Sequence, residues 1–216
     1  MQVREIAVGL WRWTGRHPDW TPDEGGADGW APEVGCVYYE APDAVVLIDP
    51  LVPREDADRF WTALDRDVKR AGRPVHVRLT VFWHGRSAQE IADRYGAEIW
   101  AHERVVEEPR REVEPARTFS FGGELPGGVQ ARDAARFDEA ILWISDHRAL
   151  VFGDVVLGAE DGGVKLCPES WLRKGGHPEM KETLRPLLEL PIERLLVSHG
   201  EPILENGRDA LARVVA

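Results

Sequence analysis

The chain has 216 residues, a formal net charge of −11 and 43% hydrophobic residues. This length and apolar content suffice for a single domain, residues 1–216, with a sizeable core. The acidic balance argues against nucleic acid as a partner, because phosphate binding needs clustered Lys and Arg, and here the basic residues are scattered among acids. No apolar run suits a membrane span or a signal peptide, so we expect no membrane partner and a cytoplasmic protein.

The first half of the chain predicts alternating strands and helices. Residues 3–14 are strand-like, 15–35 form a loop rich in Gly, Pro and Trp, and 36–49 predict a hairpin of buried strands. From residue 57 to 68 the apolar residues recur at three- and four-residue steps, which predicts a helix that Gly72 ends. The next expected elements are a strand, a helix capped by Ser87 and another strand, at 75–83, 87–95 and 98–101.

The second half predicts a further sheet, which the short intervals between its strands indicate to be antiparallel. After a charged connection at 103–117, the expected elements are strands at 118–121, 129–132, 140–145, 149–152 and 192–198, and helices around Met180 and Leu211. Two sets of strands, each followed by helices, predict an α/β fold in which two sheets pack face to face with helices outside, an αββα sandwich.

Cys36 and Cys167 are the only cysteines of the sequence, and they lack the Cys-x-x-Cys spacing of a zinc site. Neither a disulfide framework nor a cysteine-based metal site is indicated. We expect both to be packing residues.

Four segments resemble, in the family's order, landmarks of the metallo-β-lactamase superfamily, particularly its glyoxalase II-like and lactonase-like members. They are residues 46–49, which end in Asp49, residues 79–80 with 87–102, residues 150–157 around Asp154, and residues 196–202 around His199. The resemblance runs from about residue 30 to the end of the chain. It implies an αββα sandwich of two mixed sheets and a metal-dependent hydrolase.

The metal motif of that family is degenerate here. Its signature His-x-His-x-Asp-His follows Thr, whereas the four corresponding positions after Thr80 hold Val81, Trp83, Gly85 and Arg86. The position of the middle histidine ligand aligns best with Arg136. Asp154 and His199 match ligand positions directly. His84 falls one place off the motif, and a small shift of the loop would bring it into the same pocket.

These departures leave two hypotheses for the pocket. In the first, no metal is bound, and the guanidinium groups of Arg86 and Arg136 offset the buried charge of Asp154. In the second, His84, Asp154 and His199 hold a single zinc or iron ion. A third interpretation concerns His84 alone, as a polar loop residue satisfied by backbone or solvent.

The roles of the neighbouring residues stay open in the same way. We expect Trp83, Arg86, Arg136 and Asp138 to contact the substrate, and Asp138 or Glu139 to serve as base if a metal acidifies a water. Asp49 either orients pocket groups or simply ends its strand. Loop residues Trp20, Trp30, Trp171 and His177 are candidates for the pocket mouth, while His17, His76, His102 and His147 show no constellation.

The sequence therefore predicts a divergent hydrolase-like protein that acts on a small ester, thioester or other anionic molecule, with one metal or none. The alternative is a non-catalytic protein, a pseudoenzyme, that binds a small anion. A relic pocket in a protein that acts through surface contacts, as a homodimer, ranks last.

Overall fold

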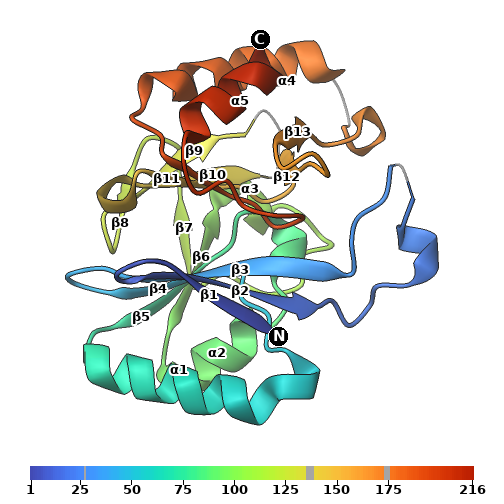
Figure 1. The fold of residues 1–216 in the computed structure, drawn as a ribbon. Helices are drawn as coiled ribbons and strands as arrows, with labels where there is room; N and C mark the ends of the chain where they lie inside the picture. Colours follow the sequence, from blue (N-terminus) through green and yellow to red (C-terminus); the bar gives the residue numbers. More distant parts are fainter. Residues whose placement is uncertain (27, 135–138, 173–175) are drawn as a thin grey trace.

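The computed structural model of the chain describes residues 1–26, 28–134, 139–172 and 176–216. These residues form two large sheets packed face to face, with α1 and α2 outside one sheet and α4 and α5 outside the other (Figure 1). The predicted αββα sandwich is therefore confirmed. The helices of the described residues are α1 (Ala57–Ala71), α2 (Ala88–Tyr95), α3 (Glu103–Val106), α4 (Gly176–Leu184) and α5 (Gly207–Val215).

The first sheet follows the chain, so that each strand lies beside the next. Its strands are β1 (Gln2–Ala7), β2 (Leu10–Arg16), β3 (Glu33–Glu40), β4 (Val45–Ile48), β5 (Val75–Arg78), β6 (Glu98–His102) and β7 (Arg117–Phe119). From β1 to β4 the neighbours are antiparallel and joined by short turns or a loop. From β4 to β7 they are parallel, which requires crossovers, and α1 and α2 supply the first two.

The second sheet has the order β14, β11, β10, β9, β8, with β11 and β14 parallel and the other neighbours antiparallel. Its strands are β8 (Glu124–Leu125), β9 (Val129–Asp133), β10 (Ala140–Ile144), β11 (Ala149–Val151) and β14 (Arg194–Leu196). The sheet is thus mixed rather than antiparallel throughout. A short hairpin of β12 (Val156–Gly158) and β13 (Val164–Leu166), which the sequence did not predict, lies beside it.

Three local expectations were wrong. The strand expected at 118–121 belongs to the first sheet, where β7 pairs with β6, because residue alternation identifies a strand but not its partner. The strand that begins at Val75 ends at Arg78 and is followed by a 3-10 turn, Phe82–His84. Ser87 makes no capping hydrogen bond to α2, because its hydroxyl accepts instead from the backbone N–H of Val52 at 2.9 Å.

The core has three layers, which follow from the alternation of side chains along the strands. Leu47 packs with the buried face of α1, which carries Phe60 and Leu64, whereas Val46 and Ile48 face the second sheet. The third layer, under α4 and α5, contains Met180, Leu184 and Leu211. Both cysteines are free and buried, as expected of packing residues. Across the ranges that the structure describes, no helix is both long and apolar enough to cross a membrane.

Candidate functional site

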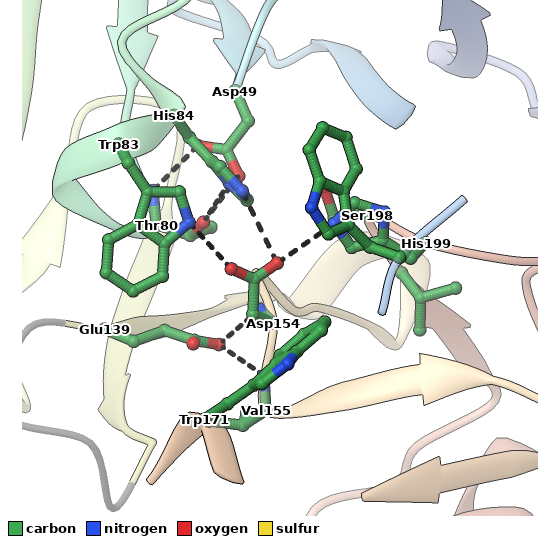
Figure 2. A network of polar contacts seen from close by, with 12 residues as sticks. Asp49, Thr80, Trp83, His84, Glu139, Asp154, Val155, Trp171, Ser198 and His199 are labelled. Carbon is green, nitrogen blue, oxygen red and sulfur yellow. Dashed lines mark hydrogen bonds and ion pairs between the residues drawn. The ribbon is translucent and has the colours of Figure 1, made fainter. Parts of the chain in front are cut away.

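The candidate site lies where four strands end, two from each sheet. Asp49 follows β4, the turn with His84 follows β5, Asp154 follows β11 and His199 follows β14. The carboxyl ends of neighbouring parallel strands meet at one edge of a sheet, so the two sheets bring these four side chains together (Figure 2). All four residues are buried, with exposed fractions of 8% or less.

Three of these side chains converge on one point. Nε2 of His199 lies 3.3 Å and Nε2 of His84 3.5 Å from Oδ1 of Asp154. One nitrogen or oxygen atom from each residue lies within 4.8 Å of the others. Oδ1 is buried and makes no hydrogen bond of good geometry. Two imidazole nitrogens and a carboxylate oxygen without a hydrogen bond suit a transition-metal ion such as zinc or iron.

Asp49 fixes the orientation of His84. Its Oδ2 lies 2.9 Å from Nδ1 of His84 and accepts from the Thr80 hydroxyl at 2.5 Å, while its Oδ1 accepts from the Thr80 N–H at 2.8 Å. Asp49 adopts a positive φ of 47°, a conformation that Asp tolerates better than most residues. With its proton on Nδ1, the imidazole directs Nε2 toward Asp154. Of the two roles considered for Asp49, the geometry favours the orientation of pocket groups.

The loop that carries Asp154 is held by Glu139 and by Trp83. Oε1 of Glu139 accepts from the backbone N–H groups of Asp154 and Val155 at 3.0 and 3.1 Å. Nε1 of Trp83 donates to Oδ2 of Asp154 at 2.8 Å. A Cβ atom at Gly153 would lie 2.7 Å from the Thr80 hydroxyl, so glycine permits this close approach of the loop to the segment that follows β5. Glu139, 1% exposed, is therefore a buried support of the loop.

The loop that carries His199 is fastened to the first sheet. The N–H of Gly35 donates to the carbonyl oxygen of Ser198 at 2.6 Å, and the guanidinium of Arg12 donates to the carbonyl oxygen of Gly200 at 2.8 Å. Arg12 also reaches the carbonyl oxygen of Val197 at 3.3 Å. These contacts join β2 and β3 to the loop that follows β14 and set the position of His199 relative to the first sheet.

Arg86 does not take the role expected of it. Its guanidinium donates to the carbonyl oxygen of Asp49 at 3.1 Å and to the hydroxyl of Ser198 at 3.0 Å. It thus joins the loops that follow β4 and β14. The cationic partner of Asp154 is His84 rather than Arg86, because the arginine's donors are directed at these two oxygens.

The charges of the cluster shift the pKa values of its members. Burial and Arg86 lower the pKa of His84, but Asp49 and Asp154 outweigh them and raise it to about 9. Burial raises the pKa of Asp154, yet His84 and His199 hold it well below its usual range. Burial, together with the charges of His84 and Arg86, lowers the pKa of His199 more than Asp154 raises it. A cluster of titratable side chains with shifted pKa values at the edge of a cavity is typical of functional sites.

A cavity of about 520 Å³ opens onto the cluster, within the size range of small-molecule sites. Its lining residues are His17, Asp19, Glu24, Trp30, Trp83, His84, Arg86, Glu112, Asp154, Trp171 and His199. The loop between β2 and β3 supplies one wall, where the Trp30 ring meets the rings of His17 and His199 edge-on at 5.2 and 5.4 Å between centroids. Trp30 and Trp171 thus line the cavity, as expected of the pocket mouth.

Sequence reasoning missed His17, which lies on this wall. Nδ1 of His17 accepts from the N–H of Asp19 at 3.3 Å, and burial together with Arg86 lowers its pKa to about 4. The ring is therefore neutral near pH 7, with its proton on Nε2. The richness of its loop in Trp, His and acidic residues was the available signal. Two other predicted site residues, Arg136 and Asp138, lie outside the described residues.

The comparisons with known proteins agree on the fold. No protein-family model and no curated protein sequence matches the chain, whereas 248 chains of solved structures do. One is the metallo-β-lactamase FIM-1 from Pseudomonas aeruginosa in a mono-zinc form, with a TM-score of 0.71, 12% identity, and coverage of 99% of this chain and 94% of that one. Another, a metallo-β-lactamase from Pontibacter korlensis, has a TM-score of 0.66, 16% identity, and coverage of 99% and 98%. The chain has the metallo-β-lactamase fold.

The metallo-β-lactamase fold is thus retained over almost the whole chain at very low sequence identity. A third neighbour, the metallo-β-lactamase from Hirschia baltica, repeats this result with a TM-score of 0.68, 14% identity, and coverage of 99% and 95%. At identities this low, the structural similarity establishes the fold alone, and the reaction has to be argued from the site.

Proposed function

We propose that this chain is a hydrolase of small ester or thioester substrates that uses a single metal ion held by His84, Asp154 and His199. The observation that carries the proposal is the convergence of three ligand atoms within 4.8 Å at the base of a cavity. Three protein ligands with an open side toward a cavity are typical of catalytic rather than structural zinc sites. The mono-zinc form of FIM-1 supports the idea that this fold accommodates one ion.

The surroundings of His84 support the same proposal. In metal sites, a ligating histidine usually donates its second ring N–H to a carboxylate, which fixes the tautomer and the ring orientation. Asp49 occupies this position behind His84, and Thr80 in turn holds Asp49 with two hydrogen bonds. Such a chain of contacts is more than a polar residue at a loop requires.

An ion at this point would polarise a substrate carbonyl and lower the pKa of a water molecule. The chain's own residues would bind and orient the substrate beside it. Trp30 and Trp171 would offer aromatic rings for apolar contact with the substrate, and the neutral ring of His17 would offer its Nε2–H as a hydrogen-bond donor. Glu139 supports the Asp154 loop, so we do not assign it the role of catalytic base. Asp138, the other base that the sequence suggested, lies outside the described residues.

The described lining does not favour an anionic ligand. Asp19, Glu24 and Glu112 place carboxylates on the wall, while Arg86 is the only Arg or Lys among the described lining residues and already donates to protein oxygens. We therefore propose an ester or thioester without a strongly anionic group near the cavity mouth.

The test is hydrolysis of chromogenic esters and thioesters of small acids by protein loaded with Zn²⁺ or Co²⁺. We expect turnover in the wild type, its loss in His199→Ala, and no change in His147→Ala, which alters a histidine outside the cavity. Turnover that is equal in the wild type and in His199→Ala would contradict the proposal, as would the absence of turnover with every substrate of both classes.

A further inference from the structure

We infer that Trp83 is a positioning residue that makes Asp154 a one-oxygen ligand and thereby sets which metal ions the site prefers. The inference rests on the proposed function, because it concerns the same ion. In this role Trp83 orients a metal ligand, Asp154, whereas the sequence suggested that Trp83 contacts the substrate.

The two oxygens of Asp154 are used differently. Oδ2 accepts from Nε1 of Trp83 at 2.8 Å, whereas Oδ1 faces Nε2 of both His84 and His199. Figure 2 shows the Trp83 indole and His199 on opposite sides of the carboxylate. Because an indole N–H only donates, it can hold an anionic oxygen but cannot bind a cation. Oδ2 is therefore committed to the protein, and Oδ1 is the oxygen left for an ion.

The fold holds Trp83 firmly in this position. It shares the 3-10 turn Phe82–His84 with the ligand His84, so one turn sets both contacts to Asp154. Its ring packs edge-on against Phe82, with 4.5 Å between centroids and an angle of 87°. Asp154 itself is 4% exposed, and its backbone is held by Glu139, so the carboxylate has little freedom to turn.

A one-oxygen carboxylate discriminates among cations. Zinc readily adopts a low coordination number, in which a single carboxylate oxygen binds beside imidazole nitrogens. Larger or harder ions such as Mn²⁺ and Ca²⁺ favour oxygen ligands and higher coordination numbers, for which a carboxylate that binds through both oxygens is well suited. By holding Oδ2, Trp83 should disfavour these ions relative to zinc.

The experiment compares Zn²⁺ and Mn²⁺ affinities, by competitive titration, in the wild type, Trp83→Phe and Trp171→Phe. Phenylalanine keeps a ring for packing on Phe82 and removes the N–H. Trp171 is the matched control, because it lines the same cavity but its Nε1 donates to the carbonyl oxygen of Asp28 at 2.7 Å. Thermal unfolding of the three proteins checks that the fold is kept.

We expect the preference for Zn²⁺ over Mn²⁺ to fall by about tenfold or more in Trp83→Phe, in the range of effects seen for partners of metal ligands. Trp171→Phe should keep the wild-type ratio. In the Co²⁺-loaded Trp83→Phe protein, the visible d–d absorption should weaken as the coordination number rises. A merely structural role would weaken the binding of both ions equally and leave the ratio of the two affinities unchanged, and this result would overturn the inference.

The two proposals fail in different ways. If the wild type binds no Zn²⁺, or binds it equally in His199→Ala, the metal site of the proposed function is wrong and the inference falls with it. If the wild type binds Zn²⁺ and Trp83→Phe shows the wild-type Zn²⁺ to Mn²⁺ ratio and Co²⁺ spectrum, only the role of Trp83 is wrong.

Discussion

Nδ1 of His84 lies 2.9 Å from Oδ2 of Asp49, in a buried position behind the candidate site. This contact determines which nitrogen of the imidazole faces the cavity. Because the Asp49 carboxylate accepts but cannot donate, it keeps a proton on Nδ1, and an ion would bind Nε2 by displacing the second proton that makes the free ring cationic near pH 7.

Asp49→Asn tests this relationship with little change of shape. We expect the amide NH₂ to face His84, where it would donate to Nδ1 and shift the ring proton to Nε2. The affinity for Zn²⁺ should then fall by roughly 10- to 100-fold, with the circular dichroism spectrum unchanged. Competition with a chromophoric chelator measures the affinity. An unchanged value would show that Asp49 merely ends its strand.

Glu139→Ala should destabilise the Asp154 loop. The substitution removes the acceptor of two backbone N–H groups, those of Asp154 and Val155, in a buried region. Each unsatisfied buried donor costs about 1–3 kcal/mol. We expect the free energy of unfolding in urea to fall by about 2–4 kcal/mol in Glu139→Ala, and by less in Glu139→Gln, which keeps a carbonyl oxygen. Equal stability of Glu139→Ala and the wild type would refute this role.

Arg86→Lys separates charge from geometry. The arginine fork spans the carbonyl oxygen of Asp49 and the hydroxyl of Ser198, which a single ammonium group cannot reproduce. We therefore expect Arg86→Lys and Arg86→Ala to weaken Zn²⁺ binding to a similar extent, as measured by calorimetric titration. Full affinity in Arg86→Lys would mean that the positive charge alone matters.

The buried thiol of Cys36 predicts a loss of stability at alkaline pH. Burial raises its pKa from an ordinary value near 9 to about 11, so the unfolded chain releases this proton before the folded one does. The contribution is fully present below pH 9 and is lost as the pH rises to about 11. This difference in pKa corresponds to at most about 3 kcal/mol of unfolding free energy. In Cys36→Ala, the decline of unfolding free energy across this range should be shallower than in the wild type, since other groups titrate equally in both.

The sequence predicted the elements whose apolar period is clear and whose ends carry a stop signal. The helix α1 is an example, because its buried residues Phe60 and Leu64 lie four apart and Gly72 adopts the left-handed conformation that ends it. The resemblance to a known family also indicated Asp154 and His199, and each lies three residues beyond the end of a short strand.

The sequence could not predict contacts made across the fold by residues without a periodic signal. The sequence suggested His84 for the pocket but not its contact with Asp49, because the residue lies in a 3-10 turn, which lacks the repeat of a longer helix or strand. Glu139 looks like an accessible base in the sequence, and its burial depends on N–H groups fifteen and sixteen residues away. His17 reaches the cavity because its loop folds back, with its N–H bonded to the carbonyl oxygen of Pro32 at 2.7 Å.

In the proposed site, His84, Asp154 and His199 hold one metal ion. The most direct measurement is the metal content of the purified protein after incubation with Zn²⁺ and exhaustive dialysis, in the wild type, His199→Ala and the control His147→Ala. We predict close to one zinc per chain in the wild type and in His147→Ala, and almost none in His199→Ala. Zinc retained equally in His199→Ala, or not retained by the wild type, would contradict the claim.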